Sequence, residues 1–132
     1  MASILELEAT NKTSRSDVAG VFYNRLKKKM TLGSDVTTYY GVKKDMTSDL
    51  SNSELASNNL YNTRNSNMAG RLPIGPICNP GIESIVSALK PTKHNYYYFV
   101  ADKNGKVYLT KTMTEHDKII EDLKVKGLWL EW

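Results

Sequence analysis

Two glutamates among aliphatic residues stand near the start of the sequence. Glu6 and Glu8 lie in the segment ASILELEAT, residues 2–10, where most of their neighbours are apolar. Apolar surroundings disfavour the charged form of a carboxyl group and raise its pKa. A raised pKa is what a general acid needs near neutral pH. The segment therefore predicts acid catalysis by a carboxyl group, with two solvated helix residues as the plainer alternative.

The spacing of these glutamates predicts different tasks for them. Alanine, leucine and glutamate favour a helix, and residues two apart on a helix point about 200° away from each other. One carboxylate is then expected to face a groove, and the other to face solvent or a salt partner.

Other chemistries lack the residues that they need. Two distant histidines and the single Cys78 give no metal-ligand spacing and no internal disulfide. Neither a GxxxxGKS/T nor a GxGxxG phosphate-binding motif occurs, so we expect no metal and no cofactor. The net charge of +4 is spread along the chain, which is weak evidence for nucleic acid and fits an anionic polymer or a membrane surface equally well.

The length of 132 residues fits a single domain. The longest apolar runs fall short of the ~20 residues that span a bilayer. We therefore expect a soluble domain, or a soluble piece of a longer protein.

The first half of the chain must position these carboxylates. We expect polar residues from Asn11 to Ser16 to break the first helix, and a second helix to run from about Asp17 to Lys29. The segment from Thr31 to Gly41 is β-branched and aromatic, which predicts a strand or a long loop, with Asp35 in a hydrogen-bonded turn. Residues 42–59 are polar and predict an exposed insertion with a short helix near residues 53–57.

The second half opens with a loop from Pro73 to Gly81, which three prolines and two glycines make stiff. A helix from Ile82 to Leu89 should follow, with Ile82, Ile85, Val86 and Leu89 facing the core. Residues 96–101 and 106–110 predict a β-hairpin with a turn at 102–105. A last helix from about Thr114 to Lys126 should bury Ile119, Ile120 and Leu123, ahead of Trp129 and Trp132. Helices and a hairpin without regular alternation indicate the α+β class.

Taken in order, these segments resemble the YceG-like (MltG) family of bacterial endolytic peptidoglycan transglycosylases. ASILELEAT is similar to the family's ASIVEKET, and VFYNRLKKKMTLGSDVTTYYG to VFxNRLxxGMxLQSDPTVxYG. YNTR, RLPIGPICNPG and YYYFVADKNGKVYLTKTMTEH are similar to YNTY, GLPPGPIxNPG and YxYFVAxxxGxHxFxxTxxEH. The departures are at Gly33, Val36, Arg64, Arg71 and Ile74, and they affect the expected glycan groove more than the reaction.

The resemblance implies a reaction and a catalytic residue. Members cut the MurNAc-β-1,4-GlcNAc bond without water and leave 1,6-anhydroMurNAc ends, and the catalytic acid, which then acts as the base, carries over to Glu6. Glu8 is then a neighbour. The remaining groups are expected to hydrogen-bond sugar substituents, stack on sugar faces or shape the groove: Asp35, Tyr40, Tyr61, Asn62, Thr63, Pro73, Gly75, Thr112 and His116. The alternative is a peptidoglycan-binding module that does not cut.

The resemblance also implies a larger setting. Residues 1–132 would form one catalytic domain, without the N-terminal membrane anchor and LysM-like region of full-length members. We expect glycan strands as the substrate, a location on the extracytoplasmic face of the bacterial membrane, and links to cell-wall synthases.

Overall fold

The computed structural model describes residues 1–9 and 12–129. The expected helix break at Asn11 and the aromatic Trp132 lie outside the described residues. The order of elements is α1 (Ala2–Glu8), α2 (Lys12–Lys27), α3 (Asp35–Val42), α4 (Asn52–Leu55), the 3-10 helix η1 (Ser66–Met68), α5 (Ile82–Leu89), β1 (Tyr98–Ala101), β2 (Val107–Thr110) and α6 (Met113–Val125). Helices and a two-stranded antiparallel sheet confirm the α+β class. In the part of the chain described, no helix has the length and apolar character needed to cross a membrane.

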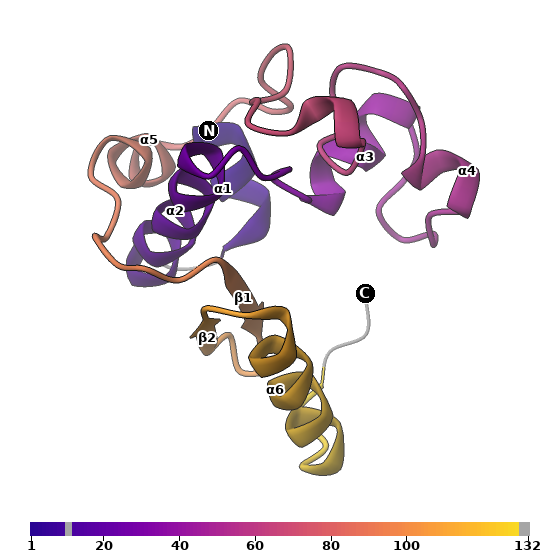
Figure 1. Cartoon of the computed structure of the whole chain (residues 1–132). Helices are drawn as coiled ribbons and strands as arrows, with labels where there is room; N and C mark the ends of the chain where they lie inside the picture. Colours follow the sequence, from indigo (N-terminus) through magenta and orange to yellow (C-terminus); the bar gives the residue numbers. More distant parts are fainter. Residues whose placement is uncertain (10–11, 130–132) are drawn as a thin grey trace.

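Three helices form the body that carries the N-terminal segment. Figure 1 shows α1, α2 and α5 packed together, with α3 and α4 beside them and the hairpin with α6 on another side. The core joins Ile4 and Leu5 of α1 to Val18 and Phe22 of α2. The Phe22 ring also meets Phe99 of β1 edge to face, with ring centroids 5.6 Å apart, so the hairpin is anchored to the same core.

Helix α2 begins at Lys12, five residues before the predicted start at Asp17. The serines that suggested a cap instead lie inside the helix, where tertiary contacts outweigh their low helix propensity. Ser16 donates its hydroxyl hydrogen to Ser87 of α5 at 3.4 Å, and Arg15 forms an ion pair with Glu6 of α1. The prediction of a strand or long loop at residues 31–41 is wrong from Asp35 onward, although residues 31–34 do form a loop.

A helix, α3, covers most of that segment because its threonines bond within a helix and across it. Thr37 donates its hydroxyl hydrogen to the Ser34 carbonyl three residues earlier, at 2.8 Å, which is a bond that threonine makes readily in helices. Thr38 donates to the Asn62 side chain at 2.7 Å. Buried partners from elsewhere in the chain therefore override the β-propensity of TTYY.

Helix α5 lies where it was predicted, but the opposite face is buried. Ser84 and Ser87 are 1% exposed, whereas Ile82 and Leu89 are 72% and 76% exposed and Ile85 is also exposed. The small serines allow α1 and α2 to approach closely, as the Ser16–Ser87 contact shows. Apolar periodicity therefore predicted the helix correctly and its buried side wrongly.

The C-terminal half follows the predicted order of elements. Strand β1 begins at Tyr98, two residues later than predicted, and pairs with β2 in the register Tyr98–Thr110 to Ala101–Val107. Asp102 closes the turn by accepting hydrogen bonds from the backbone of Asn104 at 2.8 Å and of Lys106 at 3.0 Å. In α6, Leu123 is buried, while Ile119 and Ile120 are half-buried.

Candidate functional site

Glu8 is the last residue of α1, and its side chain meets the turn that leads into α3. The Ser34 hydroxyl donates a hydrogen bond to Glu8 Oε1 at 2.5 Å. Burial raises the pKa of the Glu8 carboxyl above its ordinary value of 4.5, and the negative charge of Asp35 acts in the same direction. The Ser34 hydrogen bond and the charges of Arg25 and Arg64 oppose this shift. Among described residues no cation forms a direct ion pair with Glu8, so its protonated form is favoured more than in an exposed glutamate.

Glu6 points to another side of α1, as the helical spacing predicts. Its Oε2 forms an ion pair with Arg15 at 3.2 Å, and its Oε1 accepts a hydrogen bond from the Gly81 backbone at 2.6 Å. Arg15 also pairs with Glu83 of α5 at 3.1 Å. Both oxygens of Glu6 are therefore engaged in fastening α1 to α2 and to the start of α5.

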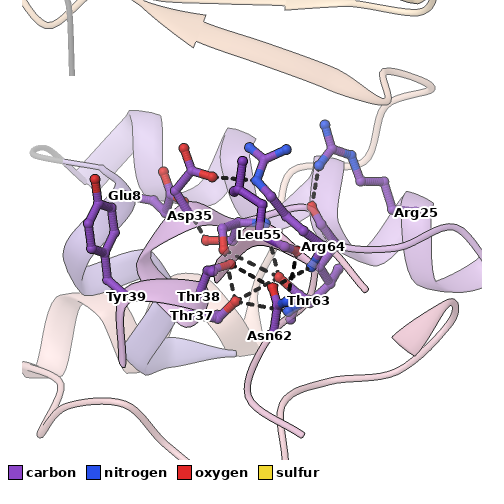
Figure 2. A network of polar contacts seen from close by, with 12 residues as sticks. Glu8, Arg25, Asp35, Thr37, Thr38, Tyr39, Leu55, Asn62, Thr63 and Arg64 are labelled. Atoms are coloured by element: carbon purple, nitrogen blue, oxygen red, sulfur yellow. Dashed lines mark hydrogen bonds and ion pairs between the residues drawn. The ribbon is translucent and has the colours of Figure 1, made fainter. Parts of the chain in front are cut away.

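An ion pair lies beside Glu8. Arg64 Nε pairs with Asp35 Oδ1, and the two side chains are 42% and 48% exposed. Figure 2 shows the carboxylates of Glu8 and Asp35 on the same side of the polar network as the Arg64 guanidinium. Glu8 thus has a second carboxylate nearby, but that carboxylate is paired with an arginine.

Asn62 holds the segment that carries Arg64. Its Oδ1 accepts hydrogen bonds from the Thr38 hydroxyl at 2.7 Å and from the Arg64 backbone at 3.2 Å. Its Nδ2 donates to the carbonyls of Leu55 at 2.9 Å and Ser57 at 2.8 Å. Asn62 is fully buried and its amide is engaged within the protein, while its expected contact with a sugar stays a prediction.

Thr63 joins the same network to the residue that contacts Glu8. Its hydroxyl lies 2.7 Å from that of Thr37 and accepts a hydrogen bond from the Ser34 backbone at 3.0 Å. The Thr63 carbonyl accepts another from Gly33 at 3.1 Å. Because Thr63 is fully buried, it positions Ser34, and through it Glu8, and has no exposed surface for a ligand.

An aromatic pair lies farther along α3. The rings of Tyr40 and Tyr61 meet at a centroid distance of 4.7 Å, and Tyr40 is 46% exposed. They line a hollow of about 440 Å³ together with Tyr39, Gly41, Lys43 and Lys44. Exposed tyrosine faces beside a hollow are suited to stack on sugar rings, as was expected of these two residues.

Comparison of the sequence with a protein-family model shows the family of this chain. The model of the YceG-like family matches residues 1–122. This chain belongs to the YceG-like family.

Proteins similar to this YceG-like chain include bacterial enzymes. It is 46% identical over 121 residues to an endolytic murein transglycosylase of Bacillus subtilis, covering 92% of this chain and 32% of the relative. It is 32% identical to an endolytic murein transglycosylase of Streptococcus pneumoniae strain D39, covering 92% of this chain and 22% of the relative. The chain therefore spans about a third or less of the length of the curated relatives that it matches.

A solved structure shares the fold. The crystal structure of a YceG-like protein from Listeria monocytogenes superposes with a TM-score of 0.79 at 43% sequence identity. The match covers 90% of this chain and 38% of that chain.

The proline- and glycine-rich loop of this YceG-like chain lies between the tyrosine pair and α1. Pro73 and Gly75 line a second hollow of about 320 Å³, whose other walls include Met1, Ala2 and Pro80. Gly75 lies against Tyr61, since a Cβ on it would be 3.4 Å from the Tyr61 hydroxyl. The loop thus borders the aromatic pair, while its link to a ligand stays a prediction.

Thr112 and His116 belong to the hairpin and α6. Thr112 caps α6 by accepting a hydrogen bond from the Glu115 backbone at 3.2 Å. The His116 ring lies 5.7 Å from that of Tyr98, and burial lowers the pKa of its imidazole. Their hydrogen bonds and ring contacts are with the hairpin and α6, although the charge of Arg25 in α2 also acts on the His116 imidazole. The described hydrogen bonds and ion pairs include none between either residue and Glu6.

Two further residues build the surroundings of Glu8, Ser34 and Arg25, and neither was among the predicted site residues. Arg25 donates from Nε to the Tyr97 carbonyl at 2.6 Å and from Nη1 to the Leu32 carbonyl, which ties α2 to both neighbouring segments. The available signal was an arginine within a helix that also carries the core residues Val18 and Phe22. Ser34 precedes a helix as a cap residue would, but its hydroxyl is used on Glu8.

The positions that depart from the family pattern have distinct surroundings. Gly33 has a φ of +62°, in the left-handed region that favours glycine. Val36 packs against the core, whereas Ile74 is 63% exposed and Arg71 is exposed. Among the departures named, only Arg64 makes an ion pair next to Glu8. Across the described residues, no group of three or more histidine, cysteine or acidic side chains is arranged to hold a metal ion.

Proposed function

We propose that this chain is the catalytic part of an endolytic murein transglycosylase, with Glu8 as the general acid and then the base. The observation that carries the proposal is the surroundings of Glu8: a half-buried carboxyl group with a raised pKa, bonded to Ser34 and free of a direct cation partner among the described residues. The names of the relatives from Bacillus subtilis and Streptococcus pneumoniae support the reaction class. The substrate would be the glycan strands of peptidoglycan.

The geometry favours Glu8 over Glu6, to which the family motif first pointed. A general acid must bring a proton to the substrate, and both oxygens of Glu6 already accept hydrogen bonds within the protein. Glu8 Oε1 is held by Ser34, which leaves Oε2 to carry the proton. Glu6 remains the competing assignment. A comparison of the Glu6→Gln and Glu8→Gln variants separates the two assignments.

One carboxyl group suffices for this reaction. Protonated Glu8 gives its proton to the glycosidic oxygen as the bond from that oxygen to C1 of the muramoyl residue breaks. The C6 hydroxyl oxygen of the same sugar bonds to C1, and its proton passes to the Glu8 carboxylate. The intramolecular nucleophile replaces the second carboxylate of ordinary glycosidases, which lies about 5–5.5 Å away in retaining enzymes, and proximity supplies much of the rate.

The identity of the product ends tests the reaction. We expect glycan strands incubated with this chain to give internal fragments with 1,6-anhydro ends, each lighter by one water than a hydrolysed fragment, measured by mass spectrometry. Hydrated reducing ends would contradict the proposal and would point to a hydrolase with Asp35 as the second carboxylate. Strands that bind without being cut would instead support a binding module.

The raised pKa of Glu8 predicts a pH dependence. Because the acid must be protonated, kcat should fall as pH rises through the folded-state pKa of Glu8, which lies above 4.5. Asp35→Asn removes a negative charge that raises this pKa and leaves Arg64 to lower it. The falling limb of the pH–rate profile should therefore move to lower pH in Asp35→Asn. A limb that stays in place or moves to higher pH would contradict the assignment of the acid.

The location and the protein partners of the whole protein stay predictions. Anchoring of the whole protein at the extracytoplasmic face of the membrane, and its association with cell-wall synthases, are inferred from the family resemblance. Fractionation of the native full-length protein, followed by its mass, would test the anchor.

A further inference from the structure

Arg64 has hydrogen-bond donors to spare beside the proposed acid. Its Nε pairs with Asp35, while its two Nη atoms have no partner among the described residues. The side chain is 42% exposed, so a ligand can reach it. Arg25, the other arginine near Glu8, differs because its Nε and Nη1 are used on backbone carbonyls.

Contacts with neighbouring residues fix the position of Arg64. The Asn62 side chain fixes its backbone N–H, and Thr63 before it is locked to Thr37. Asp35, at the first position of α3, holds Nε and so orients the plane of the guanidinium. An arginine held at one edge presents its remaining N–H groups as a fork that suits a carboxylate or another planar oxygen acceptor.

One group on a peptidoglycan strand offers such an acceptor close to the bond that is cut. Muramoyl residues carry a 3-O-lactyl ether that ends in a carboxylate, or in an amide carbonyl when a peptide is attached. The N-acetylglucosamine residues that alternate with them lack this group. A protein that forms 1,6-anhydro-muramoyl ends must place a muramoyl residue, rather than its neighbour, at the acid.

We propose that Arg64 determines this choice by binding the lactyl oxygens of the muramoyl residue whose glycosidic bond Glu8 protonates. The inference rests on the proposed function. It adds the residue that determines which sugar of the glycan strand lies at Glu8. Asp35 is then a positioning residue that aims Arg64 at the substrate. The shared ligand chemistry is the lactyl carbonyl oxygen, whether it belongs to a free carboxylate or to an amide.

Binding measurements in a Glu8→Gln background test this role without turnover and without titration of the acid. The ligands are peptide-free glycan strands, peptide-bearing strands and a chitin oligosaccharide of matched length, which has no lactyl group. We expect Arg64→Gln to weaken binding of both muramoyl strands about tenfold, which equals about 1.4 kcal/mol, and to leave binding of the chitin oligosaccharide unchanged. Arg64→Lys keeps the charge but loses the fork, so it should lose most of the same affinity.

A matched control removes one positive charge elsewhere. Lys90 follows α5 and is exposed, and Lys90→Gln should leave all three affinities unchanged. A larger loss for peptide-free than for peptide-bearing strands identifies the carboxylate as the better acceptor, and equal losses identify the carbonyl oxygen that both share; either result supports the role of Arg64.

Three results would overturn the inference. Equal losses for muramoyl strands and chitin oligosaccharide would make Arg64 a general glycan contact, and unchanged affinities would remove it from the site. A parent Glu8→Gln chain that bound none of the ligands would overturn both the proposed function and the role of Arg64. Cleavage of strands by the Glu8→Gln chain would count against the assignment of the acid alone, because the affinities could still be compared at early times.

Discussion

Glu8→Gln is expected to lower the rate at which 1,6-anhydro ends form by about 10²–10⁴-fold, the contribution that a general acid typically makes. Glutamine has nearly the same shape and can still accept the Ser34 hydrogen bond, but it has no acidic proton to give to the glycosidic oxygen. Initial rates on purified glycan strands, followed by chromatography of the fragments, measure the change.

The same substitution is expected to stabilise the fold. Because burial raises the folded-state pKa of Glu8, its contribution to stability is full at low pH and is lost as pH rises through that pKa, when the carboxylate ionises. Glutamine avoids that cost at neutral pH. We expect Tm at pH 7 to rise by about 2–4 °C, the change that about 1 kcal/mol causes in a domain of this size.

An exposed glutamate provides the matched control. Glu121 of α6 has a side chain that is 72% exposed, so Glu121→Gln should leave both rate and Tm unchanged. A Glu8→Gln chain with unaltered rate, or with a Tm below that of the wild type at pH 7, would show that Glu8 is not a desolvated acid.

Asn62→Ala is expected to cost about 3–5 kcal/mol of unfolding free energy, because it leaves buried and part-buried polar groups without partners at about 1–3 kcal/mol each. The groups that lose their partner would be the Thr38 hydroxyl, the Arg64 N–H and the Leu55 carbonyl. The Ser57 carbonyl loses one hydrogen bond but keeps the one from the Asn65 side chain at 3.1 Å. Urea unfolding should show a lower midpoint with an unchanged slope.

A neighbouring asparagine separates this effect from a loss of substrate contact. Asn67 is exposed, so Asn67→Ala should change stability by no more than about 0.5 kcal/mol. If Asn62→Ala kept wild-type stability and only raised KM, Asn62 would contact the substrate, as first expected, and the buried network would carry little of the fold.

The helix that carries Glu6 and Glu8 could be predicted from the sequence, but not the surroundings of the two glutamates. Helical spacing correctly separates Glu6 from Glu8. Which of them faces the site depends on Arg15 and Ser34, and the latter lies 26 residues from Glu8. No local sequence pattern predicts such contacts, so only the structure favours Glu8 over Glu6 as the proposed acid.

The order of elements was more predictable than their surroundings. The α+β class, the hairpin with its Asp102 turn and the last helix follow from local patterns. The helix α3 does not, because hydrogen bonds of Thr37 and Thr38 to distant residues override their β-propensity. The buried face of α5 is likewise set by the close approach of α2 at Ser87 rather than by its own apolar residues.

The most direct test of the central claim compares two variants, Glu8→Gln and Glu6→Gln, for the release of 1,6-anhydro-ended fragments from glycan strands, with folding of each verified by circular dichroism. We predict release lowered about 10²–10⁴-fold by Glu8→Gln and release within about tenfold of the wild type by Glu6→Gln, because Glu6 joins helices rather than carrying the proton. Loss of release by a folded Glu6→Gln chain, with Glu8→Gln still active, would contradict the account and return the catalytic role to Glu6.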